Sequence, residues 1–122
     1  MTFRIKKIDH IQLAAPKGCE KASREFFNGI LGLTEVEKPE ELKKRGGVWF
    51  EFGMYQLHIG VEQPFTPAKK AHPAFVIENI EELKTHLTAN NVNFVSDENL
   101  PGAIRIHLED PFGNRLEFLE WM

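Results

Sequence analysis

The chain has 122 residues, enough for one domain that buries about two-thirds of its unfolded surface. It is 42% hydrophobic and 27% charged, a composition that excludes a disordered or fibrous protein. A formal charge of −3 gives no basic surface for nucleic acid. A single cysteine, Cys19, excludes an intramolecular disulfide and favours a reducing compartment. No apolar run suits secretion or a membrane span, so a cytoplasmic protein is expected.

The first half of the chain predicts a strand, a helix and three further strands. Ala22 and Phe26 lie one helical turn apart, and Asn28 with Gly29 supplies a helix stop. Gly53 predicts a tight turn between two alternating segments. The expected elements are a strand over 4–15, a helix over 19–29, a short strand over 34–37, a charged loop or single helical turn over 39–45, and strands over 48–52 and 55–61.

The same order of elements begins again after a linker at about 63–70, which contains two prolines. Asn79 is a good N-cap, and Glu82 three residues later predicts a capping box. Residues 110–114, Asp-Pro-Phe-Gly-Asn, predict a turn. The expected elements are a strand over 71–77, a helix from Asn79 to Asn90-Asn91, a short strand over 93–95, a strand over 104–109 and a closing strand from Arg115.

The repeated order predicts a single domain made of two βαβββ modules, at about 1–62 and 71–122. Superposing the modules places His10 on His72, and His58 on Glu117. All four side chains then lie on the strand face opposite the aliphatic one. If each helix packs on the aliphatic face, the other faces form a cleft lined by four groups that can bind a metal ion.

Glu117 lies in the closing strand between two large apolar residues, Leu116 and Phe118. Taken alone, such a carboxylate is more often a residue on a solvated sheet face. A single histidine is likewise more often a hydrogen-bonded surface or core residue than a ligand. Four such groups at matching positions of two modules favour metal binding over these simpler interpretations.

The chain resembles the vicinal oxygen chelate superfamily, which includes glyoxalase I, extradiol dioxygenases, and the fosfomycin- and bleomycin-resistance proteins. The segments that carry the resemblance are IDHIQLAAP, LGL, GVWFEFG, QLHIG, AHPAFVI and DPFGNRLEF. The resemblance implies an α+β fold in which two βαβββ modules form a U-shaped, mostly antiparallel sheet cleft with helices on the outer face. It also implies His10, His72 and Glu117 as ligands of a divalent ion (Zn, Ni, Fe, Mn or Co), with His58 as a candidate fourth.

Two imidazoles and one carboxylate form a facial triad that leaves coordination positions open for substrate. Such an ion polarises a carbonyl or stabilises an enolate, and Glu117 is the candidate catalytic base. His58 departs from the glyoxalase I pattern, which has a carboxylate there, so a substrate-contacting or outer role stays open. The candidate substrate-binding residues are Gln12, Trp49, Arg105 and His107.

The implied function is that of a metal-dependent glyoxalase-like lyase or isomerase acting on a small molecule with vicinal oxygens. The alternatives are an extradiol-type dioxygenase, a drug-binding protein of the bleomycin-resistance type without catalysis, and a fosfomycin-type thiol transferase. A homodimer is expected, because family members commonly pair and because a unit of this size leaves sheet edges to cover.

Overall fold

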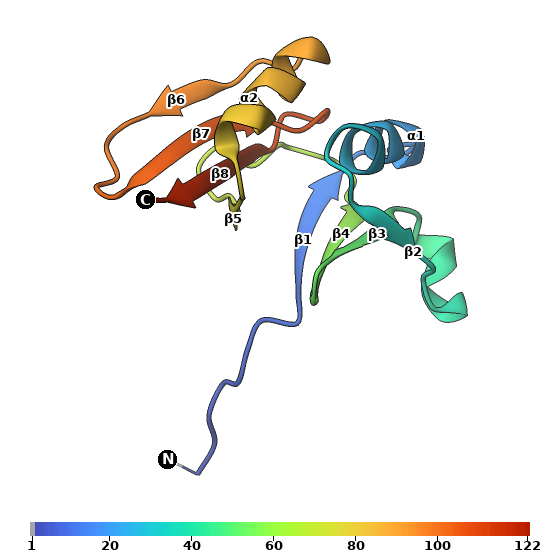
Figure 1. Cartoon of the computed structure of the whole chain (residues 1–122). Coiled ribbons are helices and arrows are strands. Elements are labelled where there is room, and N and C mark those ends of the chain that lie inside the picture. The colour runs from blue at the N-terminus through green and yellow to red at the C-terminus, as the bar shows by residue number, and fades with distance from the viewer. Residues whose placement is uncertain (1) are drawn as a thin grey trace. The chain divides into compact units, whose positions relative to one another are not determined.

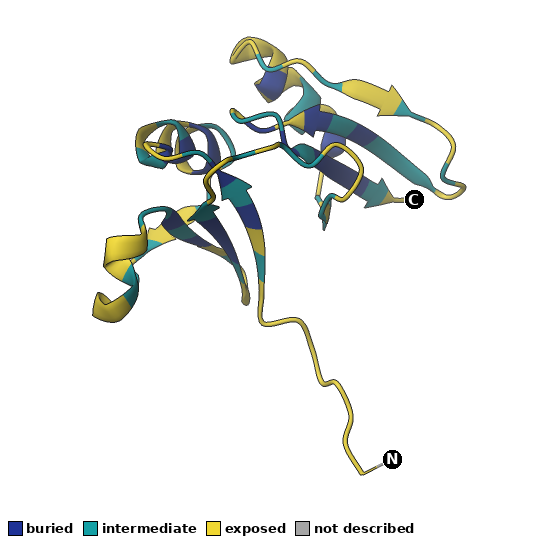
Figure 2. Ribbon diagram, turned by 180° about the vertical axis from the view of Figure 1, so that it is seen from behind, coloured by how far each residue is buried: buried dark blue, intermediate teal, exposed yellow. Residues whose placement is uncertain are grey.

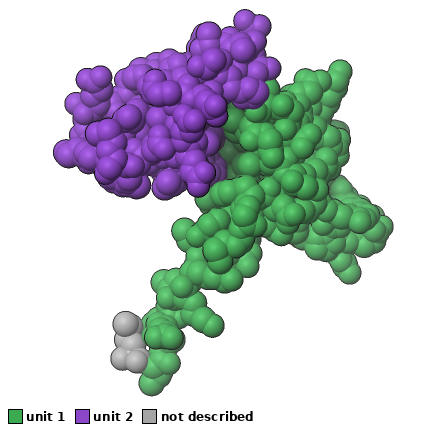
Figure 3. Space-filling model, in the orientation of Figure 1, with its two compact units in different colours: residues 1–63 green, residues 64–122 purple. Residues whose placement is uncertain are grey.

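The computed structural model describes residues 2–122, which form two compact units (Figure 1; Figure 3). The first unit is Met1–Gln63 and the second is Pro64–Met122. The elements of the first unit are β1 (His10–Ala15), α1 (Glu20–Ser23), the π-helix η1 (Arg24–Ile30), β2 (Thr34–Val36), the 3-10 helix η2 (Glu40–Arg45), β3 (Val48–Phe52) and β4 (Tyr55–Val61). The elements of the second unit are β5 (Ala74–Val76), α2 (Ile80–Ala89), β6 (Val95–Asp97), β7 (Ala103–Glu109) and β8 (Arg115–Trp121).

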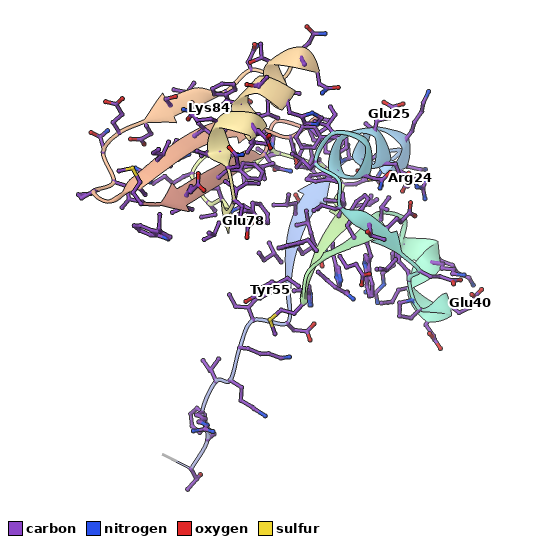
Figure 4. All side chains as sticks on the ribbon, in the orientation of Figure 1. Arg24, Glu25, Glu40, Tyr55, Glu78 and Lys84 are labelled. Atoms are coloured by element: carbon purple, nitrogen blue, oxygen red, sulfur yellow. The ribbon has the colours of Figure 1, made fainter. Side chains whose placement is uncertain are left out.

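The sheet of the first unit has the order β1-β4-β3-β2, with β1 parallel to β4 and the other pairings antiparallel. Its aliphatic face is covered by the helical segment, since the ring of Phe27 lies 5.6 Å from that of Phe50 and both side chains are fully buried. The turn into β4 is the predicted one, with Gly53 at φ 55° and Tyr55 opening the strand (Figure 4). The helix therefore fixes which face of this sheet stays open for polar side chains.

The sheet of the second unit has the same plan, in the order β5-β8-β7-β6, with only β5 and β8 parallel. Ile80 and Leu87, one face of α2, are fully buried, as are Ile106 and Leu116 of the sheet. Both units run strand, helix, strand, strand, strand, which confirms the predicted α+β fold of two βαβββ modules. Among residues 2–122, no helix has the length and apolar character that crossing a membrane requires.

Three predicted strands have other bounds in the structure. The first begins at His10, not at residue 4, because β4 pairs only with His10 and the residues after it. Residues 2–9 are exposed, with Ile5 at 92% (Figure 2). The strand predicted over 71–77 shortens to β5, and that predicted over 93–95 moves to β6. Alternation alone predicted strands where no neighbouring strand offers hydrogen bonds.

The capping box predicted for α2 is half correct. The Asn79 side chain accepts a hydrogen bond from the backbone N–H of Glu82, as predicted. The second predicted bond, from the backbone N–H of Asn79 to the side chain of Glu82, is wrong. That N–H donates instead to the carboxylate of Glu120 in β8, at 2.9 Å. The same carboxylate accepts the N–H of Ile80 at 3.0 Å, so a residue 40 positions away closes this helix end.

Candidate functional site

The open face of the first unit carries a stack of three rings. Trp49 of β3 pairs directly with His58 of β4, and their rings lie 3.7 Å apart and 2° from parallel. The ring of His10, at the start of β1, lies 4.2 Å from that of His58. The side chain of Gln12 lies directly over Gly60. A Cβ atom at position 60 would be 2.2 Å from Nε2 of Gln12, so glycine leaves the space that this side chain occupies. The repeat thus predicted correctly that these polar groups share one face.

His58 is neutral in this stack over the ordinary pH range. The side chain is 4% exposed, and burial, followed by the nearby His10, lowers the pKa of His58 to about 4. Its Nε2 donates to Oε1 of Gln56 at 2.8 Å. Nδ1 of His10 lies 2.9 Å from Oδ1 of Asp9, and this hydrogen bond holds the pKa of Asp9 below its usual value. A neutral imidazole is the form that binds a metal ion.

The open face of the second unit is centred on Glu117. This residue is 6% exposed, so its interpretation as a carboxylate on a solvated sheet face is wrong. It lies in β8 between Ala74 of β5 and His107 of β7, its direct partners in the two neighbouring strands. His72 lies two residues before the start of β5, and its Nε2 lies 2.9 Å from Oε1 of Glu117. The parallel pairing of β5 with β8 thus brings the predicted imidazole and carboxylate together.

A backbone carbonyl orients the ring of His72. Nδ1 of His72 lies 2.7 Å from the carbonyl oxygen of Lys70, which only accepts, so Nδ1 carries a proton. Nε2 of the ring faces the carboxylate of Glu117 at 2.9 Å, and with a proton on Nε2 the two form a hydrogen bond. The same nitrogen and oxygen are suitable ligand atoms for a metal ion once that proton is lost. A carbonyl that fixes the tautomer in this way is the usual partner of a metal-binding histidine.

Arg105 and Asp97 surround this pair. Nη1 of Arg105 lies 3.4 Å from Oε2 of Glu117, and its Nη2 donates to Oδ2 of Asp97 at 2.9 Å. Burial opposes the ionisation of Glu117, but the hydrogen bonds from His72 and Arg105 outweigh it and hold the pKa of Glu117 below its usual value. A hydrogen bond from the backbone N–H of Asn99 is the largest of the effects that lower the pKa of Asp97. Both carboxylates are therefore ionised at neutral pH.

His72, His107 and Glu117 each offer one ligand atom, and these atoms lie within 4.8 Å of one another. Nitrogen and carboxylate oxygen are suitable donors for zinc, nickel, iron, manganese or cobalt, so the donor set fits a divalent ion. The sequence had placed His107 among substrate contacts, and it had not singled out Asp97. The alternation of β7 indicated that Arg105 and His107 share one face. Their carboxylate partner Asp97 was missed because β6, which carries it, was predicted two residues too early.

The family model described as the Glyoxalase/Bleomycin resistance protein/Dioxygenase superfamily matches residues 7–118. The chain belongs to this superfamily. A glyoxalase family protein from Bacillus anthracis is 50% identical, with each chain fully covered and a TM-score of 0.97. No curated protein matches the chain well enough to count as a relative.

More distant members of the superfamily share the fold. A lactoylglutathione lyase from Agrobacterium tumefaciens has a TM-score of 0.75 at 20% identity, covering 95% of this chain and 94% of its own. A glyoxalase/dioxygenase from Nostoc punctiforme has a TM-score of 0.78 at 23% identity, covering 96% and 92%. These two similarities support the superfamily fold of the chain and carry no information about its reaction.

Proposed function

We propose that this superfamily member is a divalent-metal-dependent enzyme, a lyase or isomerase of the glyoxalase type, acting on a small molecule with two adjacent oxygens. The observation that carries the proposal is the part-buried contact between Nε2 of His72 and Oε1 of Glu117, an imidazole nitrogen and a carboxylate oxygen 2.9 Å apart. Superfamily membership supports the same proposal, since its known enzymes act on small molecules of this kind.

His72 and Glu117 would hold the ion, and the sequence adds His10, with His58 as a candidate fourth ligand. When bound, the ion supplies a Lewis acid that polarises a substrate carbonyl next to its second oxygen. Arg105 binds Oε2 of Glu117 and leaves Oε1 toward His72. This contact keeps the carboxylate ionised and oriented, which is what a base that takes a proton from carbon needs.

The candidate substrate-binding residues differ in how much of each side chain is available to contact a substrate. Trp49 is covered on one ring face by His58, so it offers a substrate its opposite face or its edge. Both terminal nitrogens of Arg105 are already engaged by Glu117 and Asp97. Gln12 is held over the backbone of β4 at Gly60. Among the three, Trp49 therefore has the surface most suited to an apolar part of the substrate.

The test is metal analysis of the purified protein, followed by an assay for thiol-dependent loss of methylglyoxal. We expect about one divalent ion per chain and activity that is lost in His72→Ala and Glu117→Ala. The exposed His86 of α2 provides the control, and His86→Ala should retain both metal and activity. Retention of stoichiometric metal in His72→Ala and Glu117→Ala would contradict the proposal.

The same experiment separates the alternatives. Oxygen uptake with a catechol and ferrous ion, without turnover of methylglyoxal, would identify the extradiol-type dioxygenase, which uses the same two-histidine-one-carboxylate donor set. A metal-free wild-type protein that binds a planar drug tightly would identify a binding protein of the bleomycin-resistance type. In either case the glyoxalase assignment would be abandoned.

A homodimer is part of the proposal. In the sheet of the second unit the edge strands are β5 and β6, and each exposes an apolar side chain, Val76 at 70% and Val95 at 68%. Unpaired apolar strand edges are usually covered in stable proteins. Light scattering of the eluted protein should give twice the chain mass of 14.0 kDa, and a monomer at micromolar concentration would reject this part.

A further inference from the structure

We propose that His107 is a further protein ligand of the metal ion beside His72 and Glu117, so that the second unit contributes two imidazoles and a carboxylate to the ion. The inference rests on the proposed metal dependence and goes beyond it, because the sequence assigned His107 to substrate contacts. Its ligand partners are His72 and Glu117.

The strand register places His107 for this role. His107 in β7 and Glu117 in β8 are direct cross-strand partners, so their side chains leave the sheet on the same face. The rings of His72 and His107 meet edge to face, with centroids 5.7 Å apart. Ligands at about 2.0–2.2 Å from a zinc ion lie about 3–3.5 Å from one another. One ligand atom from each of the three residues lies within 4.8 Å of the others, which approaches this spacing.

The hydrogen bonds of His107 leave one nitrogen for the ion. Its Nε2 lies 3.1 Å from Oδ2 of Asp97 and donates a hydrogen bond to that carboxylate oxygen. The other nitrogen, Nδ1, is buried and has no hydrogen-bond partner among the described residues. Buried polar atoms in folded proteins are nearly always satisfied. A histidine held by a carboxylate through one nitrogen and binding a metal ion through the other is a common arrangement in metalloproteins.

The charges around the three groups favour a dication. Glu117 and Asp97 are ionised, and Arg105 lies against both of them, which leaves a net single negative charge. The guanidinium takes Oε2 of Glu117 and Oδ2 of Asp97, so Oε1 of Glu117 stays on the side of His72. Arg105 therefore orients the carboxylate instead of competing for the ligand oxygen.

The experiment compares zinc affinity, measured by competition with a chelating dye, in the wild type and four variants: His107→Gln, His86→Gln, His72→Ala and Glu117→Ala. His107→Gln is the decisive variant, because its amide can still donate to Asp97 but offers no imidazole nitrogen. Loss of a partner outside the ligand set costs about 10–100-fold in affinity, so loss of a true ligand should cost more than about 100-fold. His86→Gln is the matched control and should leave the affinity unchanged.

A direct readout accompanies the affinity. Pulsed electron paramagnetic resonance with Cu²⁺ counts the imidazoles on the ion, and we expect one fewer in His107→Gln than in the wild type. In wild type labelled with ¹⁵N-histidine, zinc should shift the Nδ1 resonance of His107. This second measurement needs no substitution and therefore decides even if the variant fails to fold.

The outcomes are distinct. An unchanged imidazole count, or an Nδ1 resonance of His107 that zinc does not move, would show that His107 only supports Asp97 and would overturn the inference. If His72→Ala and Glu117→Ala lose zinc while His107→Gln keeps it, this inference fails and the proposed function stands. If none of these variants loses zinc, the proposed function fails as well.

Discussion

Nε2 of His72 lies 2.9 Å from Oε1 of Glu117, although the two residues are 45 positions apart in the chain. The backbone N–H of Glu117 donates to the carbonyl of Pro73 at 3.1 Å, which extends the parallel pairing of β5 and β8 by one step toward His72. The contact is thus a product of sheet register. The backbone pairing of the two strands therefore holds the side chain of His72 close to the carboxylate of Glu117.

The first prediction concerns Glu117→Gln. In the metal-free protein the amide of the variant can keep a hydrogen bond with Nε2 of His72, because it carries both a donor and an acceptor. The free energy of unfolding should therefore change much less than in Glu117→Ala. Zinc affinity should fall more than about 100-fold, because a neutral amide is a poor metal ligand. Urea unfolding and chelator competition measure the two effects, with the exposed Glu98→Gln as control.

A different pair of results would contradict this account. If Glu117→Gln destabilises the metal-free fold as strongly as Glu117→Ala, Glu117 stabilises the fold mainly through Arg105 and not through His72. If zinc affinity is unchanged, the carboxylate is not a ligand.

Much of the fold could be predicted from the sequence because its determinants are local. Turn chemistry at Gly53 and at Asp110–Asn114, and alternation in β3, β4, β7 and β8, mark strands that pair along their full length. The bounds of β1 and β5 depend on how far the neighbouring strand extends, which no local pattern contains. The second partner of Asn79 is Glu120, 41 positions away, and a short-range capping rule could not have found it.

The site was predicted in part, and for a similar reason. The repeat identified which side chains share a face within each unit, and His58 with Trp49 and His72 with Glu117 lie together as that pattern requires. It could not show that His107 and Arg105 are tied to Asp97, because that contact depends on the register of β6 against β7. The assignment of ligands remains a prediction.

The second prediction concerns pH and the ring stack of the first unit. The pKa of His58 is about 4 in the folded protein, below the ordinary histidine value of 6.5, because the side chain is buried. Between these values the unfolded chain binds more protons than the folded one, so stability falls as the pH is lowered from 6.5 to 4. In metal-free protein, the urea midpoint should drop over this window, and His58→Phe should flatten the profile.

The fluorescence of Trp49 can follow the protonation of His58 directly. Trp121→Phe leaves Trp49 as the single tryptophan, and its ring faces His58 at 3.7 Å. Protonation of His58 places a cation on the indole face, so Trp49 emission should change with a midpoint near pH 4. A midpoint near 6.5 would show that His58 is hydrated and not buried in the stack.

The third prediction concerns Glu120, which closes the first turn of α2. Its carboxylate accepts the N–H groups of Ile80 and Asn79, and these bonds hold the pKa of Glu120 below its usual value. The stabilisation is present above the ordinary pKa of about 4.3 and is lost as the pH falls through the lower folded value. Glu120→Ala should lower the urea midpoint at pH 7. The difference in urea midpoint between wild type and variant should be smaller at pH 3.

Glu120→Gln is the matched variant, since its amide oxygen still accepts a hydrogen bond but does not titrate. Its stability should lie between those of the wild type and Glu120→Ala at pH 7. An equal loss in both variants at every pH would mean that the contact stabilises α2 by packing alone.

The last prediction concerns Asn114, which ties the segment before β5 to the turn before β8. Its Oδ1 accepts the N–H of Ala68 at 3.0 Å, and its Nδ2 donates to Asp110 at 2.9 Å. The side chain is 1% exposed, so Asn114→Ala leaves the part-buried N–H of Ala68 and a buried carboxylate oxygen of Asp110 without this partner. Each unsatisfied group costs about 1–3 kcal/mol, so the free energy of unfolding should fall by about 2–6 kcal/mol.

Asn99→Ala is the control, because Asn99 is exposed and contributes only its backbone N–H to Asp97. Its unfolding free energy should stay within about 0.5 kcal/mol of the wild type. The Asn114 variant should also bind zinc more weakly, since among the described residues Ala68 keeps only the hydrogen bond from the N–H of Arg115, and the chain continues from there to Lys70, whose carbonyl orients His72. A destabilised variant with full zinc affinity would show that His72 is positioned by β5 alone.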